Sequence, residues 1–316
     1  MSVPSGVDAA LAAPRRDKLG YALATLSFLV WGSVGVLVRT TDMPASALIV
    51  ARMSIAAAVV AAVFARRPML AELRDRRLLR LLAAMGAFSA ATLLMFFIAL
   101  RLTDVAIAMF LLFTGPVYVA LLAPRVLGER PDRVVYPAVA VALGGMAVML
   151  LPGLTGGGGG HRLSTVGVLC ALAAGFTYTG YAITVKILTR SARSVTIALA
   201  EMVLDMVFLL PLAVWQLSTS AFRMTLHDLL VVLVLALVCT AAPYVMFVES
   251  IRRIRVEHAS ILGYLEPMSA PLYALLLLGE TTAATTVAGG LLIVAAGVLV
   301  VVFGSPEGDV GDVAPP

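Results

Sequence analysis

Residues 263–280 read GYLEPMSAPLYALLLLGE, an apolar run that carries a single carboxylate, Glu266. Placing a carboxylate within the hydrocarbon core of a bilayer costs free energy, and such residues usually have a functional role. A related run, LFTGPVYVALLAPRVLGE, occurs earlier in the chain at residues 112–129, with glycine at the position of the glutamate. Whether such runs span a membrane, and how far the repetition extends, determine the architecture.

The whole chain is too apolar for a soluble protein. Of its 316 residues, 61% are hydrophobic and only 13% are charged, and the mean hydropathy is +1.02. A soluble domain is about half apolar and a quarter charged. Ten stretches approach the roughly 20 residues that a helix needs to cross the hydrocarbon core: 19–38, 45–64, 78–100, 103–123, 134–152, 164–185, 194–217, 229–250, 256–278 and 284–304. We therefore expect an all-α polytopic membrane protein with ten transmembrane helices.

Basic residues predict the orientation of these helices. If the N-terminus is cytoplasmic, 18 of the 23 lysines and arginines fall in cytoplasmic segments, four fall outside, and Arg52 lies within the second stretch. This bias is the positive-inside pattern, and it predicts a multi-pass membrane protein with both termini in the cytoplasm. The Ala- and Arg-rich composition and the absence of a targeting segment predict that this membrane is a bacterial inner membrane. The basic residues are spread over several turns, which argues against nucleic-acid binding.

The two runs belong to a long internal repeat. Residues 78–129 align without a gap on residues 229–280, and 17 of the 52 positions are identical. The repeat divides the chain into a cytoplasmic tail (1–18), a first five-helix unit (19–152), a Gly-rich outer linker (153–163), a second five-helix unit (164–304) and a disordered cytoplasmic tail (305–316). Because five is odd, the second unit enters the membrane from the opposite face. Inverted repeats suit alternating access around a central site.

The five-plus-five pattern resembles the EamA-type branch of the drug/metabolite transporter superfamily. The matching motifs are Trp31-Gly32, Ala51-Arg52-Met53 and the Pro…Gly-Glu segments Pro116 to Glu129 and Pro267 to Glu280. The resemblance covers about residues 19–304. It implies a carrier of small metabolites, often an amino-acid exporter, with a cavity between the halves. In size and layout the chain is most similar to exporters of aromatic and neutral amino acids.

Glu266 is the leading candidate for a substrate contact. Ten residues at about 1.5 Å each place it roughly 15 Å from the start of its helix, near the membrane midplane. Its repeat equivalent is Gly115, so the carboxylate breaks the internal symmetry. Pro267 removes a backbone donor and is expected to loosen the helix there. Glu266 could bind a substrate amine, carry a coupling proton, or bridge helices as a neutral acid.

Three other charged residues are expected within the membrane. Glu201 and Asp205 share one helix face, and two carboxylates so close in an apolar medium do not both stay ionised without a cation. Arg52 is the repeat equivalent of Glu201, which suggests the hypothesis that it pairs with one of these acids at the interface between the halves. Equivalent positions far from the symmetry axis would instead lie apart. Glu249 stands beside Arg252 and Arg253, which predicts a local ion pair.

Aromatic and hydroxyl side chains at middle depths complete the candidate site. Rings with a polar edge suit a pocket for small organic solutes, although each could equally be packing. The substrate-binding candidates are Trp31, Thr92, Phe96, Thr114, Tyr178, Tyr181, Tyr244, Tyr264 and Glu266.

Several functional classes find no support in the sequence. There is no nucleophile–base set, nucleotide motif or histidine pair at metal-ligand spacing, so we expect neither an enzyme nor a cofactor nor a metal. We therefore predict an exporter of small metabolites, of which amino acids, aromatic or neutral, are the first candidates, and proton coupling is one option for its energy source. The sequence does not determine the oligomeric state. The alternatives are efflux of organic cations, transport of nucleotide sugars or sugar phosphates, and a scaffold or receptor that transports nothing.

Overall fold

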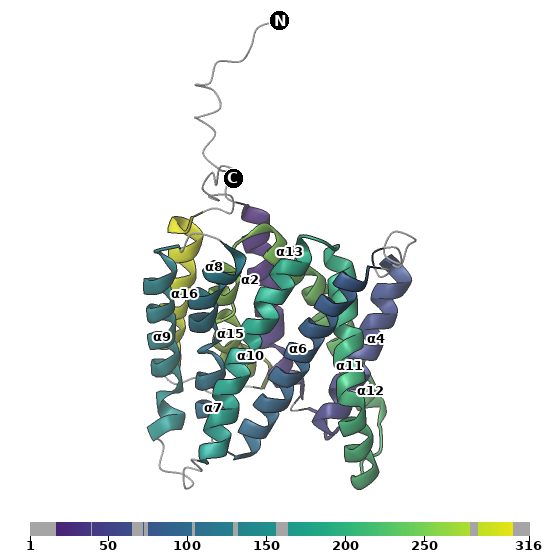
Figure 1. Cartoon of the computed structure of the whole chain (residues 1–316). Helices are drawn as coiled ribbons and strands as arrows, with labels where there is room; N and C mark the ends of the chain where they lie inside the picture. Colours follow the sequence, from purple (N-terminus) through teal and green to yellow (C-terminus); the bar gives the residue numbers. More distant parts are fainter. Residues whose placement is uncertain are drawn as a thin grey trace, which may run out of the picture.

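The structure, a computed structural model, describes residues 17–38, 40–64, 72, 75–102, 105–128, 132–155, 164–278 and 284–305. Its elements are all helical (Figure 1). They are α2 (Lys18–Gly32), α3 (Val34–Val38), α4 (Ala45–Phe64), α6 (Arg76–Leu102), α7 (Val105–Leu112), α8 (Gly115–Leu127), α9 (Val135–Thr155), α10 (Thr165–Thr189), α11 (Ser194–Thr219), α12 (Leu226–Ala236), the π-helix η1 (Leu237–Ala241), α13 (Ala242–Arg253), α14 (Val256–Leu262), α15 (Leu265–Leu278) and α16 (Ala284–Phe303).

Every predicted apolar stretch coincides with helix in the described part of the chain. Six of the helical segments there are both long and apolar enough to cross a membrane, and Gly115–Leu127, Val135–Val148 and Val287–Phe303 are shorter apolar helices. This confirms an all-helical, multi-pass fold, while the number ten stays a prediction. The tails 1–16 and 306–316, the linker residues 156–163, Glu129 and Glu280 lie outside the described residues; residues 153–155, predicted as linker, extend α9.

Equivalent helices of the two halves make equivalent contacts with each other. In the repeat, α2 corresponds to α10 and α6 to the α12–α13 segment. The pairs α6–α10 and α2–α13 are both extensive packing contacts, so the same contact forms twice. Helix α4 packs on its own equivalent, α11, and α9 on its own equivalent, α16 (Figure 1). This arrangement is that of a pseudo-two-fold axis between the halves.

The halves are inverted with respect to each other. We call the end of the bundle where α2 begins and α16 ends the terminal face, and the other end the opposite face (Figure 1). Asp17, just before α2, forms an ion pair with Arg253 at the end of α13, and Ser305, just after α16, donates to Asp132 before α9. Helix α2 thus starts at the terminal face, where its equivalent α10 ends.

Two helices break at equivalent places. α7 ends at Leu112 before the turn at Phe113 and Thr114, and α14 ends at Leu262 before the turn at Gly263 and Tyr264. Phe113 and Tyr264 are repeat equivalents and touch: the Tyr264 hydroxyl donates to the Phe113 carbonyl at 2.6 Å, with ring centroids 5.8 Å apart. The expected loosening at Pro267 therefore lies about one turn earlier, at Gly263–Tyr264.

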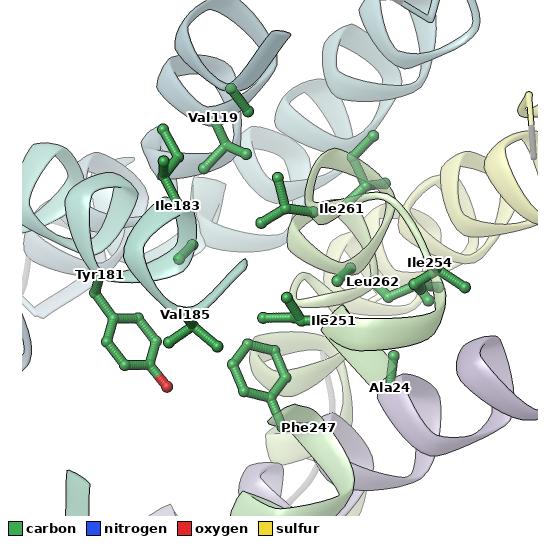
Figure 2. Close-up of a cluster of buried hydrophobic side chains, with 14 of the residues drawn as sticks. Ala24, Val119, Tyr181, Ile183, Val185, Phe247, Ile251, Ile254, Ile261 and Leu262 are labelled. Carbon is green, nitrogen blue, oxygen red and sulfur yellow. The ribbon is translucent and has the colours of Figure 1, made fainter. Parts of the chain in front are cut away.

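The buried core of the described residues consists of one large cluster and three smaller ones. One large cluster joins the terminal-face ends of α2, α6, α8, α10 and α13 with α14 and α16 (Figure 2). Toward the opposite face, one cluster combines α4, α12 and η1, and a separate one combines α6, α7 and α10. Val34 packs against the first of these and Phe96 against the second. A further cluster joins α4 and α11 and extends along α4 from Ile49 to Val60. In the described residues, therefore, the largest cluster lies toward the terminal face, and smaller separate ones surround it.

Candidate functional site

A cavity of about 280 Å³ lies between the two halves. It is lined by nine of the residues that the sequence singles out, from both halves: Trp31, Arg52, Thr92, Phe96, Tyr178, Tyr181, Glu201, Tyr244 and Glu266. Ligand pockets commonly measure about 300–1,000 Å³. The volume therefore suits a small metabolite better than a nucleotide sugar.

One wall of the cavity is a continuous aromatic surface. The Trp31 ring contacts Phe28, Tyr244 and Phe247 edge to face, with centroids 5.3 to 5.4 Å apart. Tyr181 stacks on Phe247 at 6.4 Å. Edge-to-face pairs of this kind add about 0.5–1.5 kcal/mol each beyond area burial. The wall is therefore a rigid apolar surface onto which a flat substrate group can stack.

The orientation of Trp31 depends on an irregularity in the eighth span. Pro243 has no backbone N–H to donate to the carbonyl of Cys239, four residues earlier, and the helix widens there into η1. The Trp31 indole N–H donates to that Cys239 carbonyl at 3.1 Å. Ser27, one turn earlier on α2, donates to the Pro243 carbonyl at 3.1 Å. A proline in one half thus positions the aromatic ring of the other half.

The cavity combines one cation with two carboxylates among its described lining residues, namely Arg52, Glu201 and Glu266. Arg52 Nε and Glu201 Oε2 are buried without a hydrogen-bond partner in the described part of the chain. No ion pair is found there between Arg52 and either Glu201 or Asp205. The pairing that the sequence left open is thus not formed in this structure, and these charged groups face the cavity with unused hydrogen-bonding capacity.

The position of Glu266 follows from the broken helix. Glu266 is the second residue of α15, directly after the turn, and its N–H donates to the Gly263 carbonyl at 3.1 Å. Gly32 allows α2 to approach closely here, because a Cβ on it would lie 2.8 Å from the Glu266 carbonyl oxygen. In the other half, a Cβ on Gly115 would lie 2.9 Å from the Tyr178 ring. Only the second half therefore has room for a carboxylate at this position.

Three of the candidates do not line the cavity. The Thr114 hydroxyl bonds to the Leu111 carbonyl of its own chain segment at 2.6 Å. Tyr264 is fully buried and bonds to Phe113. Asp205 is fully buried behind Glu201. Thr92 lines the cavity but also bonds to Phe88 and to the hydroxyl of Thr177.

The sequence reasoning missed several lining residues: Phe28, Val34, Ser89, Leu93, Met109, Leu112, Phe113, Pro116, Phe247, Ser260 and Gly263. Phe247 could have been found, because it is the repeat equivalent of Phe96. Ser89 and Ser260 carry no sequence signal, since small hydroxyl residues are common in membrane helices.

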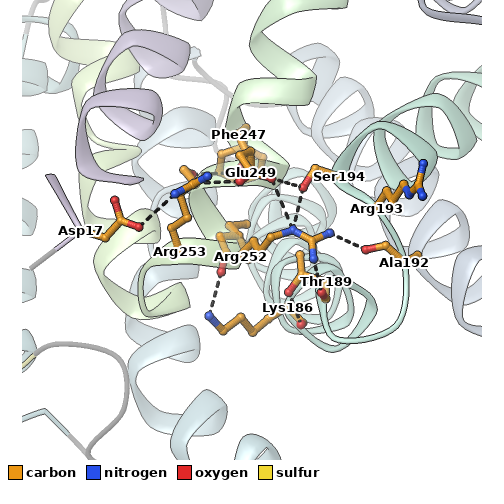
Figure 3. A network of polar contacts seen from close by, with 12 residues as sticks. Asp17, Lys186, Thr189, Ala192, Arg193, Ser194, Phe247, Glu249, Arg252 and Arg253 are labelled. Carbon is orange, nitrogen blue, oxygen red and sulfur yellow. Dashed lines mark hydrogen bonds and ion pairs between the residues drawn. The ribbon is translucent and has the colours of Figure 1, made fainter. Parts of the chain in front are cut away.

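A polar network closes the terminal face (Figure 3). Arg253 forms ion pairs with Glu249 at 2.7 Å and with Asp17 of the other half at 3.2 Å. Arg252 also pairs with Glu249 at 3.4 Å and donates to carbonyls at the end of α10. Lys186, which is buried, donates to two carbonyls at the end of α13 at 2.7 and 2.9 Å. The local Glu249 ion pair expected from the sequence is confirmed.

A second group of bonds joins the halves beside this network. His258 on α14 contacts the Tyr21 hydroxyl through Nδ1 at 2.7 Å and Asp132 through Nε2 at 2.8 Å. Burial alone would raise the pKa of Asp132, but the hydrogen bonds from His258 and from the Ser305 and Val134 N–H groups outweigh it and lower the pKa to about 2. Asp132 is therefore an ionised acceptor, and His258 donates through Nε2. No cluster of three or more metal-ligating side chains occurs in the described residues.

Comparison with known proteins places these features in a family. The model of the EamA-like transporter family matches residues 18–151 and 165–303. The chain is 26% identical over 187 residues to an uncharacterized transporter, YwfM, of Bacillus subtilis (strain 168), covering 59% of this chain and 61% of the relative. It is 28% identical over 206 residues to an uncharacterized transporter of Archaeoglobus fulgidus, covering 64% and 69%. It thus spans less than two thirds of the first relative.

A solved structure, described only as the crystal structure of a protein, has the same fold. Its TM-score is 0.74 with 19% sequence identity, and the match covers 89% of this chain and 95% of the other. At that identity the likeness concerns the fold alone. The family model, in contrast, matches both halves of the chain on either side of the linker. The chain therefore belongs to the EamA-like transporter family and has its multi-pass membrane fold.

Proposed function

We propose that the protein exports zwitterionic amino acids, with aromatic or neutral side chains, by alternating access between its inverted halves. The observation that carries this proposal is the composition of the cavity: a guanidinium, two carboxylates and an aromatic wall around about 280 Å³. An amino acid presents the complementary set, which is a carboxylate, an ammonium and a side chain.

Arg52 is the proposed partner of the substrate carboxylate. A guanidinium can hold a carboxylate through two parallel hydrogen bonds, and Arg52 Nε has no partner among the described residues. Glu266 is the proposed partner of the ammonium group, with Glu201 nearby. The substrate side chain would lie against Trp31 and Tyr244. Hydrogen bonds to charged groups contribute about 1.5–3 kcal/mol each, so either charged end is worth at least a tenfold change in affinity.

The rival substrates fit the lining less well. Phosphorylated sugars need several cationic groups, and Arg52 is the single basic residue of the described lining. Organic cations would satisfy Glu266 and Glu201 but would leave Arg52 in the cavity without an anion. A buried unpaired charge is costly, so a zwitterion is favoured over a cation.

The basic residues support the membrane orientation that the proposed export requires. The basic residues Lys186, Arg252 and Arg253 gather at the terminal face (Figure 3), and Arg255 follows there at the start of α14. Such a cluster suits the cytoplasmic side of an inner membrane. With this orientation the structure corresponds to a state closed toward the cytoplasm. Transport would then require opening of the terminal-face contacts and closure of the cavity toward the opposite face.

The test compares three molecules that differ only in their charged ends. Proteoliposomes are assayed with labelled phenylalanine, phenethylamine and 3-phenylpropionate, which are the zwitterion, the cation and the anion of one skeleton. We expect exchange of phenylalanine and at most a tenth of that rate for the other two. Glu266→Gln and Arg52→Gln should each lower phenylalanine exchange about tenfold or more, whereas the exposed Asp42→Asn should not.

Each alternative has its own signature in this assay. Phenethylamine moving as fast as phenylalanine would identify an organic-cation carrier instead. Equal phenylalanine exchange by Glu266→Gln and by the parent protein would remove Glu266 from the site. Absence of exchange for all three molecules, in protein that is monodisperse and correctly inserted, would refute the amino-acid assignment.

A further inference from the structure

We propose that Glu201 and Asp205 on α11 form a proton-binding site that couples amino-acid export to proton entry. The inference rests on the proposed function, since it concerns the energy source of that transport. It is carried by the burial, spacing and missing partners of the two side chains.

The two carboxylates are close together and removed from solvent. Residues four apart on a helix have Cβ atoms about 5–6 Å apart on one face. Glu201 is 3% exposed and Asp205 is 0% exposed. Glu201 Oε2 and both carboxylate oxygens of Asp205 make no hydrogen bond of standard geometry to the described residues; the nearest hydroxyl groups are those of Tyr181 beside Glu201 and Ser89 beside Asp205. Two ionised carboxylates in this setting would repel each other without compensation, so a proton on the pair is the simplest way to stabilise it.

The surroundings supply too few positive charges to replace that proton. The titratable groups that face the pair are Arg52 from α4, Tyr181 from α10, Tyr244 from α13 and Glu266 from α15. Arg52 is the single cation among them, against three carboxylates. A zwitterionic substrate has no net charge and so does not change this balance. A proton changes it by one charge.

The pair also has a route to water and a place at the moving interface. Glu201 lines the cavity, while Asp205 lies one helical turn further along α11 and outside the lining. Helix α11 packs on α4, its repeat equivalent. The interface between equivalent helices is where an exchange of conformation between the halves alters the surroundings. The pair can therefore take up a proton from one side and release it to the other.

The transport step changes no covalent bond of the substrate. With the site open to the outside, a carboxylate oxygen of the pair accepts a proton from water. After the conformational change the proton leaves to the cytoplasmic side, and an amino acid binds for export. One proton enters for each amino acid that leaves.

The experiment separates coupling from binding. Proteoliposomes containing the intact protein receive a gradient of one pH unit, with the membrane potential held at zero by potassium and valinomycin. One-to-one coupling sustains up to about a tenfold phenylalanine gradient, because one pH unit and a tenfold concentration ratio are the same free energy. Exchange of labelled for unlabelled phenylalanine without a pH gradient is measured in parallel, since exchange needs no net proton movement.

We expect Asp205→Asn, whose side chain lies outside the cavity lining, to reduce the phenylalanine concentration ratio that the pH gradient sustains from about ten to about one, while exchange stays within about threefold of the parent. Glu201→Gln should lower the same ratio, and because Glu201 lines the proposed substrate site, this variant is compared with its own exchange rate. Asp42→Asn, an exposed carboxylate on the opposite face, is the matched control and should retain both activities. Because exchange reports a folded transporter, its retention in Asp205→Asn excludes misfolding as the cause.

Three results would overturn the inference. A tenfold ratio retained by both variants would exclude the pair from coupling. Loss of exchange along with the gradient-driven ratio would assign the pair to substrate binding or to folding. Parent protein that exchanges phenylalanine but ignores the pH gradient would refute coupling and leave the proposed function intact, whereas parent protein without any exchange would refute the proposed function itself.

Discussion

Replacing His258 with alanine tests whether the bonds around this residue hold the terminal face closed. The imidazole is completely buried and bridges Tyr21 and Asp132, both in the first half, from α14 in the second half. The Tyr21 and His258 rings also stack at 5.9 Å. In the proposed alternating-access cycle, opening the terminal face would separate the halves at this point, so the contacts would exist only in the closed state.

The expected effect follows from two hydrogen bonds. The bond to the ionised Asp132 contributes about 1.5–3 kcal/mol, and the bond to the Tyr21 hydroxyl about 0.5–1.5 kcal/mol. Their loss removes about 2–4.5 kcal/mol from the closed state alone. Since about 1.4 kcal/mol is a tenfold change in an equilibrium constant, the balance shifts roughly 30- to 2,000-fold toward the open terminal face. Tyr21→Phe, which removes only the weaker bond, should shift it about two- to tenfold.

The shift can be followed with a cysteine reporter. In a chain with Cys170→Ala and Cys239→Ala, the variant Ala24→Cys places a thiol at a fully buried position of the terminal-face core. We expect His258→Ala to accelerate its reaction with a water-soluble maleimide by at least tenfold. The control is His227→Ala, an exposed histidine on the opposite face that bonds to the Thr40 carbonyl. An unchanged labelling rate in His258→Ala would show that these bonds do not hold the face closed.

Three further predictions concern packing, acid stability and the cavity wall. Gly145→Ala should lower the free energy of unfolding by about 1–3 kcal/mol, because the new Cβ would lie 2.7 Å from a backbone oxygen of α16. The control is Gly144→Ala, whose Cβ would have no atom within 4 Å. Equal melting temperatures of the two variants would contradict this packing. The pKa of Asp132 lies at about 2 instead of 3.8, so its ionised form contributes about 2.5 kcal/mol to the free energy of unfolding above pH about 4, and this contribution is lost toward pH 2. In Asp132→Asn, stability should therefore depend less on pH in this range. An equal loss of stability between pH 4 and 2 in the variant and the parent would argue against this role. Trp31→Phe keeps the ring but loses the bond to the Cys239 carbonyl, so phenylalanine should bind about three- to tenfold more weakly in exchange assays, and unaltered affinity would show that the bond is dispensable.

The sequence anticipated much of the candidate site because depth in the membrane is a local property. Counting residues from the end of an apolar stretch was enough to bring Trp31, Tyr178 and Glu266 to one cavity. The same count could not tell which side of a helix faces that cavity. Thr114 and Tyr264 lie at suitable depths, but they contact the broken helices instead.

The sequence alone determined the apolar stretches, the odd number of stretches in each repeat and the exchange of Gly115 for Glu266. These features can be read from composition and residue order, because the free energy of transfer into the bilayer favours helices of about 20 apolar residues and basic residues favour the cytoplasmic side. The inversion of the second half relative to the first followed from the odd number of stretches in each repeat.

Only the tertiary structure decided how groups distant in the chain meet. Gly144 and Gly145 are identical in sequence terms, yet only Gly145 faces a backbone oxygen of α16. Arg52 and Glu201 are repeat equivalents, yet both face the cavity without forming an ion pair. Contacts between helices depend on rotation and close approach at the scale of about 1 Å, and the repeat of one chain with itself carries no such distances.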